Sequence, residues 1–303
     1  MFKSIKTSAV AIGLTVAGYA LACGVNNGGF VPENDLYIPA NMKGLTGGIT
    51  EEQFNAVIDK VETLYAPIVA SKGGVLKVVR KWNDGTVNAY ALRTGKTWEV
   101  DMFGGLARHS TITEDGFALV VCHEIGHHIG GAPKKGGATS GGGWWGGSTG
   151  TSSWATNEGG ADYFATLKCL RNAFMNDNNA TIVKNLNAPK VLVDACKKTY
   201  KNKDDANICI RGGMAGKSVS DLFSVLGKLP ETKFETPDTK VVTKTDDNHP
   251  KAQCRLDTYF QGAICDADLN TDVSDTDENK GVCSVVNGDK IGNRPLCWFK
   301  PKK

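Results

Sequence analysis

Apolar residues recur at helical spacing between residues 50 and 71. Thr50 stands before this run and Gln53 follows three residues later, which is the capping-box pattern of a helix N-terminus. Apolar positions spaced by three and four residues mark the buried face of an amphipathic helix. We therefore predict a helix from Thr50 to about Ser71, with a buried face formed by Phe54, Val57, Ile58, Val61, Leu64 and Tyr65.

The segments that follow alternate between apolar and polar residues, as half-buried strands do. The first, residues 75–82, ends at Asn83-Asp84-Gly85, a sequence typical of a hairpin turn. A second hairpin is predicted for residues 87–93 and 98–103. Helical spacing returns over residues 113–129. Strands that precede helices along the chain favour an α+β domain.

The predicted helix over 113–129 contains His123-Glu124-Ile125-Gly126-His127. Residues four apart lie on one face of a helix, so both imidazoles can bind one metal ion. Glu124 stands next to the first histidine, where its carboxylate can take a proton from metal-activated water. The alternative is a surface helix with two unrelated histidines. The pattern predicts a zinc site with His123 and His127 as ligands and Glu124 as the general base.

A catalytic zinc ion usually has a third protein ligand. The metzincin pattern would place a histidine where this chain has Pro133, which cannot ligate through its side chain. A glutamate on a later helix is the other solution, and Glu158 provides it. Asp162, four residues further on, can then accept a hydrogen bond from a ligand histidine. The alternative is an ordinary acidic helix start. Gly159 and Gly160 suggest close packing against the helix of the histidine motif.

Four motifs follow one another in a fixed order. They are Val87-Asn88-Ala89-Tyr90-Ala91, the histidine motif, Glu158 to Asp162, and His249-Pro250-Lys251-Ala252-Gln253-Cys254-Arg255. This order resembles the gluzincin peptidases of the CAAX-prenyl-protease and HtpX type, over roughly positions 50 to 265. The resemblance implies a thermolysin-like zincin core with an antiparallel edge strand beside the zinc helix.

The same resemblance implies roles for residues outside the first two motifs. Asn88 and Ala89 would hold a substrate in extended form. His249 would lie near the metal, as a transition-state donor or a latching ligand, and Arg255 would make a supporting contact. The alternative for His249 is a surface histidine before a loop proline.

The N-terminus reads as an export signal. Two lysines precede an apolar run that ends at Ala20-Leu21-Ala22, which fits a small-x-small cleavage site. Residues 1–22 are therefore predicted to be a signal peptide. Cys23 follows directly and is a candidate lipid-anchor site, although Ala20 stands where bacterial lipoproteins usually carry leucine. After the signal peptide the sequence has no stretch of about 20 apolar residues, so no transmembrane helix is predicted.

The cysteine count fits an exported chain. There are nine cysteines, and setting Cys23 aside leaves an even number, as disulfide pairing requires. If Cys254 and Cys265 share one helix, they lie about 16 Å apart and cannot bridge each other. Each would then pair elsewhere, for instance with C-terminal cysteines; the pairings themselves stay open. We expect a metallopeptidase domain over residues 23–265 and a disulfide-linked C-terminal extension over residues 266–303.

Charge and composition narrow the partners. The formal net charge of +3 falls close to zero without the signal lysines, which argues against a nucleic-acid or anionic-membrane surface. Residues 130–156 form an insert rich in glycine and serine that also carries three tryptophans, Trp144, Trp145 and Trp154. The sequence leaves open whether this insert is a flexible linker or a lid over the cleft.

The sequence thus predicts an exported zinc endopeptidase with one zinc ion and polypeptide substrates. Its place would be the bacterial periplasm, or the outer membrane if Cys23 is lipidated, or the medium if the chain is secreted. The alternative function is a zinc-retaining, chaperone-like binding module that cleaves little. A purely structural zinc is a third reading, in which protein fills all four coordination positions.

Overall fold

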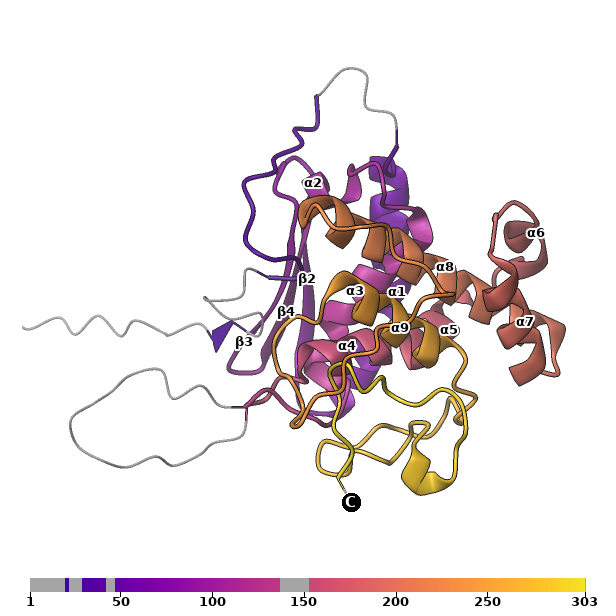
Figure 1. Ribbon diagram of the computed structural model, residues 1–303. Helices are drawn as coiled ribbons and strands as arrows, with labels where there is room; N and C mark the ends of the chain where they lie inside the picture. The colour runs from indigo at the N-terminus through magenta and orange to yellow at the C-terminus, as the bar shows by residue number, and fades with distance from the viewer. Residues whose placement is uncertain (1–19, 22–28, 42–46, 137–152, 303) are drawn as a thin grey trace, which may run out of the picture.

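The computed structural model describes residues 20–21, 29–41, 47–136 and 153–302. It has the predicted α+β composition, with a small mixed sheet beside a larger group of helices (Figure 1). The strands are β1 (Ala20–Leu21), β2 (Val75–Lys81), β3 (Ala89–Thr94) and β4 (Thr97–Phe103). The helices are α1 (Glu51–Ser71), α2 (Gly104–Ala107), α3 (Glu114–Ile129), α4 (Glu158–Phe164), the π-helical segment η1 (Ala165–Cys169), α5 (Leu170–Phe174), α6 (Asn179–Lys184), α7 (Lys190–Thr199), α8 (Lys203–Leu226), α9 (Ala252–Ala263) and the 3-10 segment η2 (Val285–Asn287).

Helix α1 begins and ends as predicted. The Thr50 hydroxyl accepts a hydrogen bond from Gln53 N, and the Gln53 side chain accepts one from Thr50 N, which completes the capping box. The apolar stripe is buried apart from Leu64, which is 38% exposed. This face of α1 packs against β2 and α3.

The sheet has the strand order β1-β3-β4-β2. Strands β3 and β4 are antiparallel and pair from Ala89↔Met102 to Thr94↔Thr97, so the second predicted hairpin is confirmed. Strand β3 also contacts α3, which agrees with an antiparallel strand beside the histidine helix. Strand β1 pairs only with Leu92 and Arg93 of β3.

The first predicted hairpin is wrong. Strand β2 pairs with β4 in parallel and not with β3, so no hairpin forms at Asn83-Asp84-Gly85. This turn instead packs against the start of α2, where Gly105 N donates to Asp84 O at 2.9 Å. A Cβ at Gly105 would lie only 1.9 Å from Gly85 O. The local turn signal therefore marks a close backbone contact.

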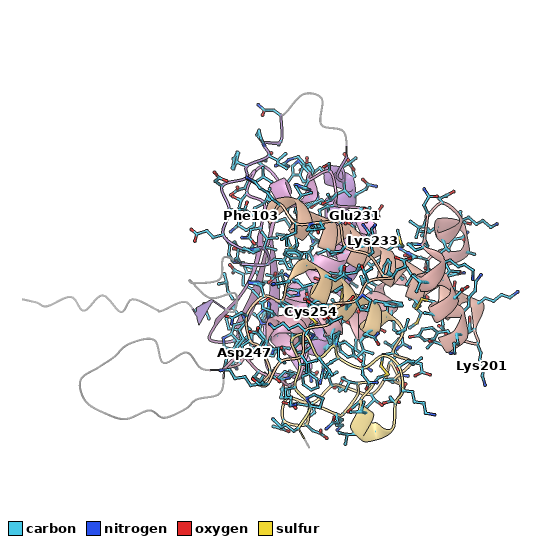
Figure 2. The ribbon with its side chains drawn as sticks, in the orientation of Figure 1. Phe103, Lys201, Glu231, Lys233, Asp247 and Cys254 are labelled. Carbon is cyan, nitrogen blue, oxygen red and sulfur yellow. A yellow bond between two sulfur atoms is a disulfide. The ribbon has the colours of Figure 1, made fainter. Side chains whose placement is uncertain are left out.

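Helices α3, α4, α8 and α9 pack against one another, while α6 and α7 project away from the sheet (Figure 1). In Figure 2, Cys254 at the start of α9 lies in the middle of the molecule, whereas Lys201 lies at the outer tip beyond α7. The centre of the molecule is thus the place where α3, α4 and α9 meet.

All eight cysteines outside Cys23 are paired. Cys254 and Cys265 each bridge to a C-terminal cysteine and not to each other, as predicted. The remaining pairs join α3 to η1 and α7 to α8. The four disulfides are Cys122–Cys169, Cys196–Cys209, Cys254–Cys297 and Cys265–Cys283.

The C-terminal extension packs directly on the helices of the centre. Trp298 is fully buried, and its indole N–H donates to the Thr258 hydroxyl on α9 at 2.9 Å. Within the described ranges, no helix has the length and apolar character to cross a bilayer. Cys23 and nearly all of the predicted signal peptide lie outside the described residues, as do residues 137–152 of the insert.

Candidate metal centre

The two histidines of α3 and Glu158 of α4 converge where these helices meet. His123 Nε2 lies 3.3 Å from Glu158 Oε2, and His127 Nε2 lies 3.7 Å from Glu158 Oε1. All three side chains are fully buried. One ligand atom from each residue lies within 4.8 Å of the others, so the group can hold a metal ion. Helical spacing brings the histidines together, and the contact between the two helices brings the carboxylate to them.

The close approach of α3 and α4 occurs at Gly126, inside the histidine motif. A Cβ at this position would lie 3.1 Å from Ala161 O. Gly159 and Gly160, which were expected to pack against α3, do not face it. A Cβ at Gly159 would lie 2.2 Å from the Trp298 indole, and Gly160 faces the loop before α4. Gly159 therefore makes room for the C-terminal extension.

Asp162 holds the first histidine from behind. Its Oδ1 lies 2.7 Å from His123 Nδ1, as predicted, so Nε2 faces Glu158. Arg255 Nε and Nη2 donate to the two Asp162 oxygens at 2.8 and 2.6 Å, and the Tyr259 hydroxyl donates to Oδ1 at 2.7 Å. Burial alone would lower the pKa of His123, but the Asp162 and Glu158 carboxylates outweigh it and raise that pKa to about 9.

A backbone carbonyl holds the second histidine. His127 Nδ1 donates to Thr156 O at 2.8 Å, and Thr156 N donates back to His127 O at 2.9 Å. This contact fixes the tautomer in which Nε2 can ligate. The sequence contained no signal for it, because a main-chain acceptor has no residue signature.

Glu124 lies fully buried beside His123. Burial raises its pKa to about 7, with the nearby charge of Glu158 acting in the same direction. A carboxyl group with a pKa near neutrality can both accept and release a proton at physiological pH. This is the property that a general base and acid needs.

Two cationic or polar side chains contact the Glu158 carboxylate on opposite oxygens. Lys135 Nζ lies 2.7 Å from Oε1, and His249 Nε2 lies 3.1 Å from Oε2. His249 therefore lies beside the candidate metal ligand Glu158, where the resemblance placed it. Burial would raise the pKa of Glu158, but His249, Lys135 and His127 hold it well below its usual range.

Lys135 is a site residue that the sequence reasoning missed. It lies in the base of the insert, where Lys135 N donates to Ala155 O and Lys134 pairs with Thr156 in an antiparallel bridge. Neighbouring residues of an extended segment point to opposite sides. Lys134 accordingly points outward to Asp275, while Lys135 points inward to the metal ligands. Only this alternation in the sequence could have indicated Lys135 as a site residue, and it lies in a segment whose composition suggested a linker.

Asn88 and Ala89 lie at the site, but they hold another part of the chain. The Asn88 side chain accepts from Val31 N at 3.1 Å and donates to Val31 O at 3.4 Å. Ala89 O accepts from Phe30 N at 2.9 Å. Residues 30–31 thus occupy the backbone positions that the resemblance assigns to a substrate.

The insert is anchored by aromatic stacking. The Trp154 ring stacks on His128 at 5.0 Å, and Arg93 lies 3.5 Å from the centre of the Trp98 ring. Arg93 also donates to His128 O at 2.7 Å. Arg93 also lies 4.6 Å from the centre of the Trp154 ring, so the end of the insert contacts both β3 and the last turn of α3.

The residues present fit a zinc ion. Two imidazoles and one carboxylate are a common catalytic zinc set. His123 Nε2 and Glu158 Oε2 are buried and make no hydrogen bond among the described residues, as expected of atoms arranged for a metal. A second cluster, Asp238 with Cys254 and Cys297, is no such site because both cysteines are in a disulfide.

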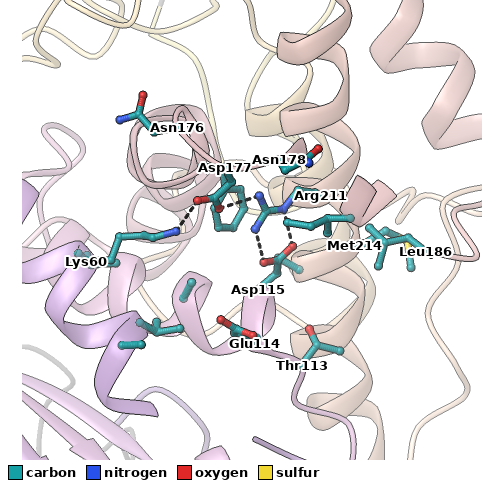
Figure 3. Close-up of a pocket in the computed structure, with 17 residues that line it drawn as sticks. Lys60, Thr113, Glu114, Asp115, Asn176, Asp177, Asn178, Leu186, Arg211 and Met214 are labelled. Carbon is teal, nitrogen blue, oxygen red and sulfur yellow. Dashed lines mark hydrogen bonds and ion pairs between the residues drawn. The ribbon is translucent and has the colours of Figure 1, made fainter. Parts of the chain in front are cut away.

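A cavity of about 740 Å³ lies apart from this centre, between α1, the start of α3, α6 and α8. Figure 3 shows Arg211 inside it, with carboxylates on both sides. Arg211 donates to both oxygens of Asp115 at 2.9 and 2.7 Å and to Asp177 at 2.9 Å. Lys60 Nζ lies 2.7 Å from Asp177 as well, so both cations of this cavity are paired with carboxylates.

Comparisons of the chain with protein-family models, with curated proteins and with solved structures found no match. The interpretation of the site accordingly depends on its own residues and geometry.

Proposed function

We propose that this protein is a zinc-dependent peptidase. The observation that carries the proposal is the buried convergence of His123, His127 and Glu158, with Glu124 beside the first histidine. Three protein ligands leave a coordination position for water or substrate, whereas a structural zinc site is closed by four. Catalysis therefore fits the ligand set better than a structural role.

Each residue has a defined task in peptide hydrolysis. Bound zinc supplies a Lewis acid that polarises a carbonyl and makes water more acidic. Glu124 takes a proton from the attacking water and delivers it to the leaving amine. Asp162 and the Thr156 carbonyl hold the two imidazoles in the ligating tautomer. Lys135 donates a hydrogen bond to the ligand carboxylate, and the His249 imidazole lies beside it.

The motif order supports a gluzincin endopeptidase with a thermolysin-like core. Strand β3 lies beside α3, as the resemblance implies for the strand next to the zinc helix, although β1 and Phe30 already pair with its outer side. Four disulfides support export to an oxidising compartment, such as a bacterial periplasm or the medium, since disulfides persist there. Lipidation of Cys23 would place the protein on a membrane.

A second candidate function is a zinc-retaining, chaperone-like binding module with little cleavage. One observation favours it. Residues 30–31 already occupy the backbone of Ala89 and the side chain of Asn88, the two residues assigned to substrate.

The test is the variant Glu124→Gln, with zinc content measured alongside cleavage of denatured casein. We expect zinc to be retained and turnover to fall by about 10²–10⁴, because the proton transfer is lost. Glu114→Gln is the matched control, since Glu114 is an exposed carboxylate in the first turn of the same helix. Full turnover in Glu124→Gln would refute the assigned role. Wild-type protein that binds casein without producing fragments would support the second function.

A further inference from the structure

The segment around Phe30 lies far from the metal ligands in sequence but is built into the centre of the molecule. Its main chain is held at four points. Phe30 N donates to Ala89 O, Val31 exchanges two hydrogen bonds with Asn88, and Arg255 Nη1 donates to Phe30 O at 3.0 Å. Phe30 and Val31 are both fully buried.

The Phe30 side chain touches the first candidate zinc ligand. Its ring lies edge-on to the His123 imidazole, with the ring centroids 4.8 Å apart and the planes at 75°. On its other sides the ring packs against Phe223 at 5.4 Å and against the Arg255 guanidinium at 4.7 Å. The imidazole is thus bounded by an aromatic edge and by the Asp162 carboxylate, which lies 2.7 Å from Nδ1.

These contacts restrict the same ring in two complementary ways. Asp162 fixes the direction of Nδ1 by a polar contact, but a single contact of this kind leaves the ring free to tilt. The Phe30 ring packs against the imidazole at 4.8 Å, and the His127 ring lies 4.6 Å from the same imidazole, so Phe30 limits the tilt of His123 on its own side. Phe30 also binds Arg255 through its carbonyl, and Arg255 binds Asp162 through both carboxylate oxygens. One residue therefore supports both the ligand and the partner of the ligand.

We propose that Phe30 is a positioning residue for the metal ligand His123, and that the segment Phe30–Val31 is a required part of the metal centre. The inference rests on the metal binding of the proposed function and not on proteolysis. It also assigns a structural task to Asn88 and Ala89, which hold this segment in place.

The experiment compares Phe30→Ala with Phe54→Ala in the full chain. Both phenylalanines are fully buried in the same apolar core, but Phe54 packs against Trp82 and Phe117 and not against a candidate ligand. Zinc affinity is measured by competition with a chelator, and ligand geometry by the visible absorption of the Co²⁺-substituted protein. We expect Phe30→Ala to raise the zinc Kd by about 10–100-fold, the range for loss of an outer partner of a ligand, and to change the Co²⁺ spectrum. Phe54→Ala should leave both unchanged while it lowers the Tm.

Phe30→Leu keeps the proposal testable if the alanine variant does not fold. Leucine refills only part of the space, so its zinc Kd and Co²⁺ spectrum should depart from those of wild type, and wild-type values in Phe30→Leu alone would then overturn the inference. A wild-type Kd and spectrum in both Phe30 variants would overturn the inference, as would an equal loss in Phe54→Ala. A changed Kd in a protein that cleaves nothing would uphold the inference and refute the peptidase. Wild-type protein that binds no zinc would overturn both.

Discussion

Arg255 offers the sharpest test of how the candidate metal centre is supported. Its side chain is fully buried, and it neutralises Asp162 through two hydrogen bonds of 2.8 and 2.6 Å. It also donates to Phe30 O, so it connects the N-terminal segment to the carboxylate behind His123. The variant Arg255→Met keeps much of the length of the side chain and removes the charge.

The size of the effect follows from burial. Removing one partner of a buried ion pair costs about 3–5 kcal/mol when the other charge is left uncompensated. Asp162 keeps the Tyr259 hydroxyl and the His123 imidazole as partners, so this range is an upper bound for Arg255→Met. In a chain of this length each kcal/mol lowers the Tm by about 2–4 °C, so the metal-free variant should melt at most roughly 6–20 °C lower. Asp162 would also orient His123 less well, and zinc affinity should fall by about 10–100-fold.

The assay needs a variant that loses an equivalent ion pair away from the metal. Arg211 supplies it, since its side chain is only 4% exposed and donates to both oxygens of Asp115 (Figure 3). Arg211→Met should lose comparable stability but keep its zinc affinity within about twofold, because distant sites couple weakly. Thermal unfolding and chelator competition are measured on both proteins.

Two results would refute the reasoning about Arg255. One is an unchanged zinc affinity in Arg255→Met despite a lower Tm, which would reduce the residue to a core ion pair. The other is an equal loss of zinc affinity in both variants, which would show that any loss of stability weakens the site.

Two more predictions follow from the same centre. Replacing both cysteines of Cys122–Cys169 by alanine should lower the free energy of unfolding by about 4 kcal/mol and zinc affinity at least tenfold, because this bridge joins α3 to η1 one residue from His123. Replacing both cysteines of Cys196–Cys209 should lower the free energy of unfolding by about 3 kcal/mol and leave zinc affinity unchanged. Chemical denaturation with zinc titration checks this, and equal zinc affinity in the two double variants would contradict it. The pKa of His123 is raised to about 9 in the metal-free protein, so at pH 7 the ring is protonated and must lose its proton to ligate. Zinc binding should therefore release about one proton from this residue at pH 7, and affinity should rise roughly tenfold per pH unit until about pH 9 and then level off. Calorimetry in two buffers of different ionisation enthalpy measures the proton, and its absence would show that His123 is already neutral.

Local sequence patterns predicted those elements whose stabilising contacts are themselves local. The capping box of α1 and the hairpin of β3 and β4 are examples, since the residues that form them are neighbours in the chain. The histidine motif belongs to the same class, because one helix presents both rings. Glu158 and Asp162 were predictable only through the chemistry of a missing third ligand.

The failures came from contacts between distant segments. The turn at Asn83-Asp84-Gly85 has a hairpin sequence, but the parallel pairing of β2 with β4 took precedence. The contacts of Phe30 and Thr156 with the two histidines could not be predicted, because Phe30 resembles any other apolar residue in the sequence and Thr156 acts through its main-chain carbonyl. Lys135 lay in a segment whose composition suggested a linker.

The order in which this centre can assemble follows from where its parts lie. The ligands stand on two helices, but their supports come from Phe30, from the Thr156 carbonyl and from Arg255 on α9. In a zinc finger the metal binds ligands close in sequence and drives folding. Here Asp162 is paired and both imidazoles are oriented by contacts that involve no metal. Because contacts that involve no metal hold these distant parts together, we expect the proposed zinc ion to bind a site that is already formed. Its stabilising effect should then follow mass action, growing with the logarithm of zinc concentration.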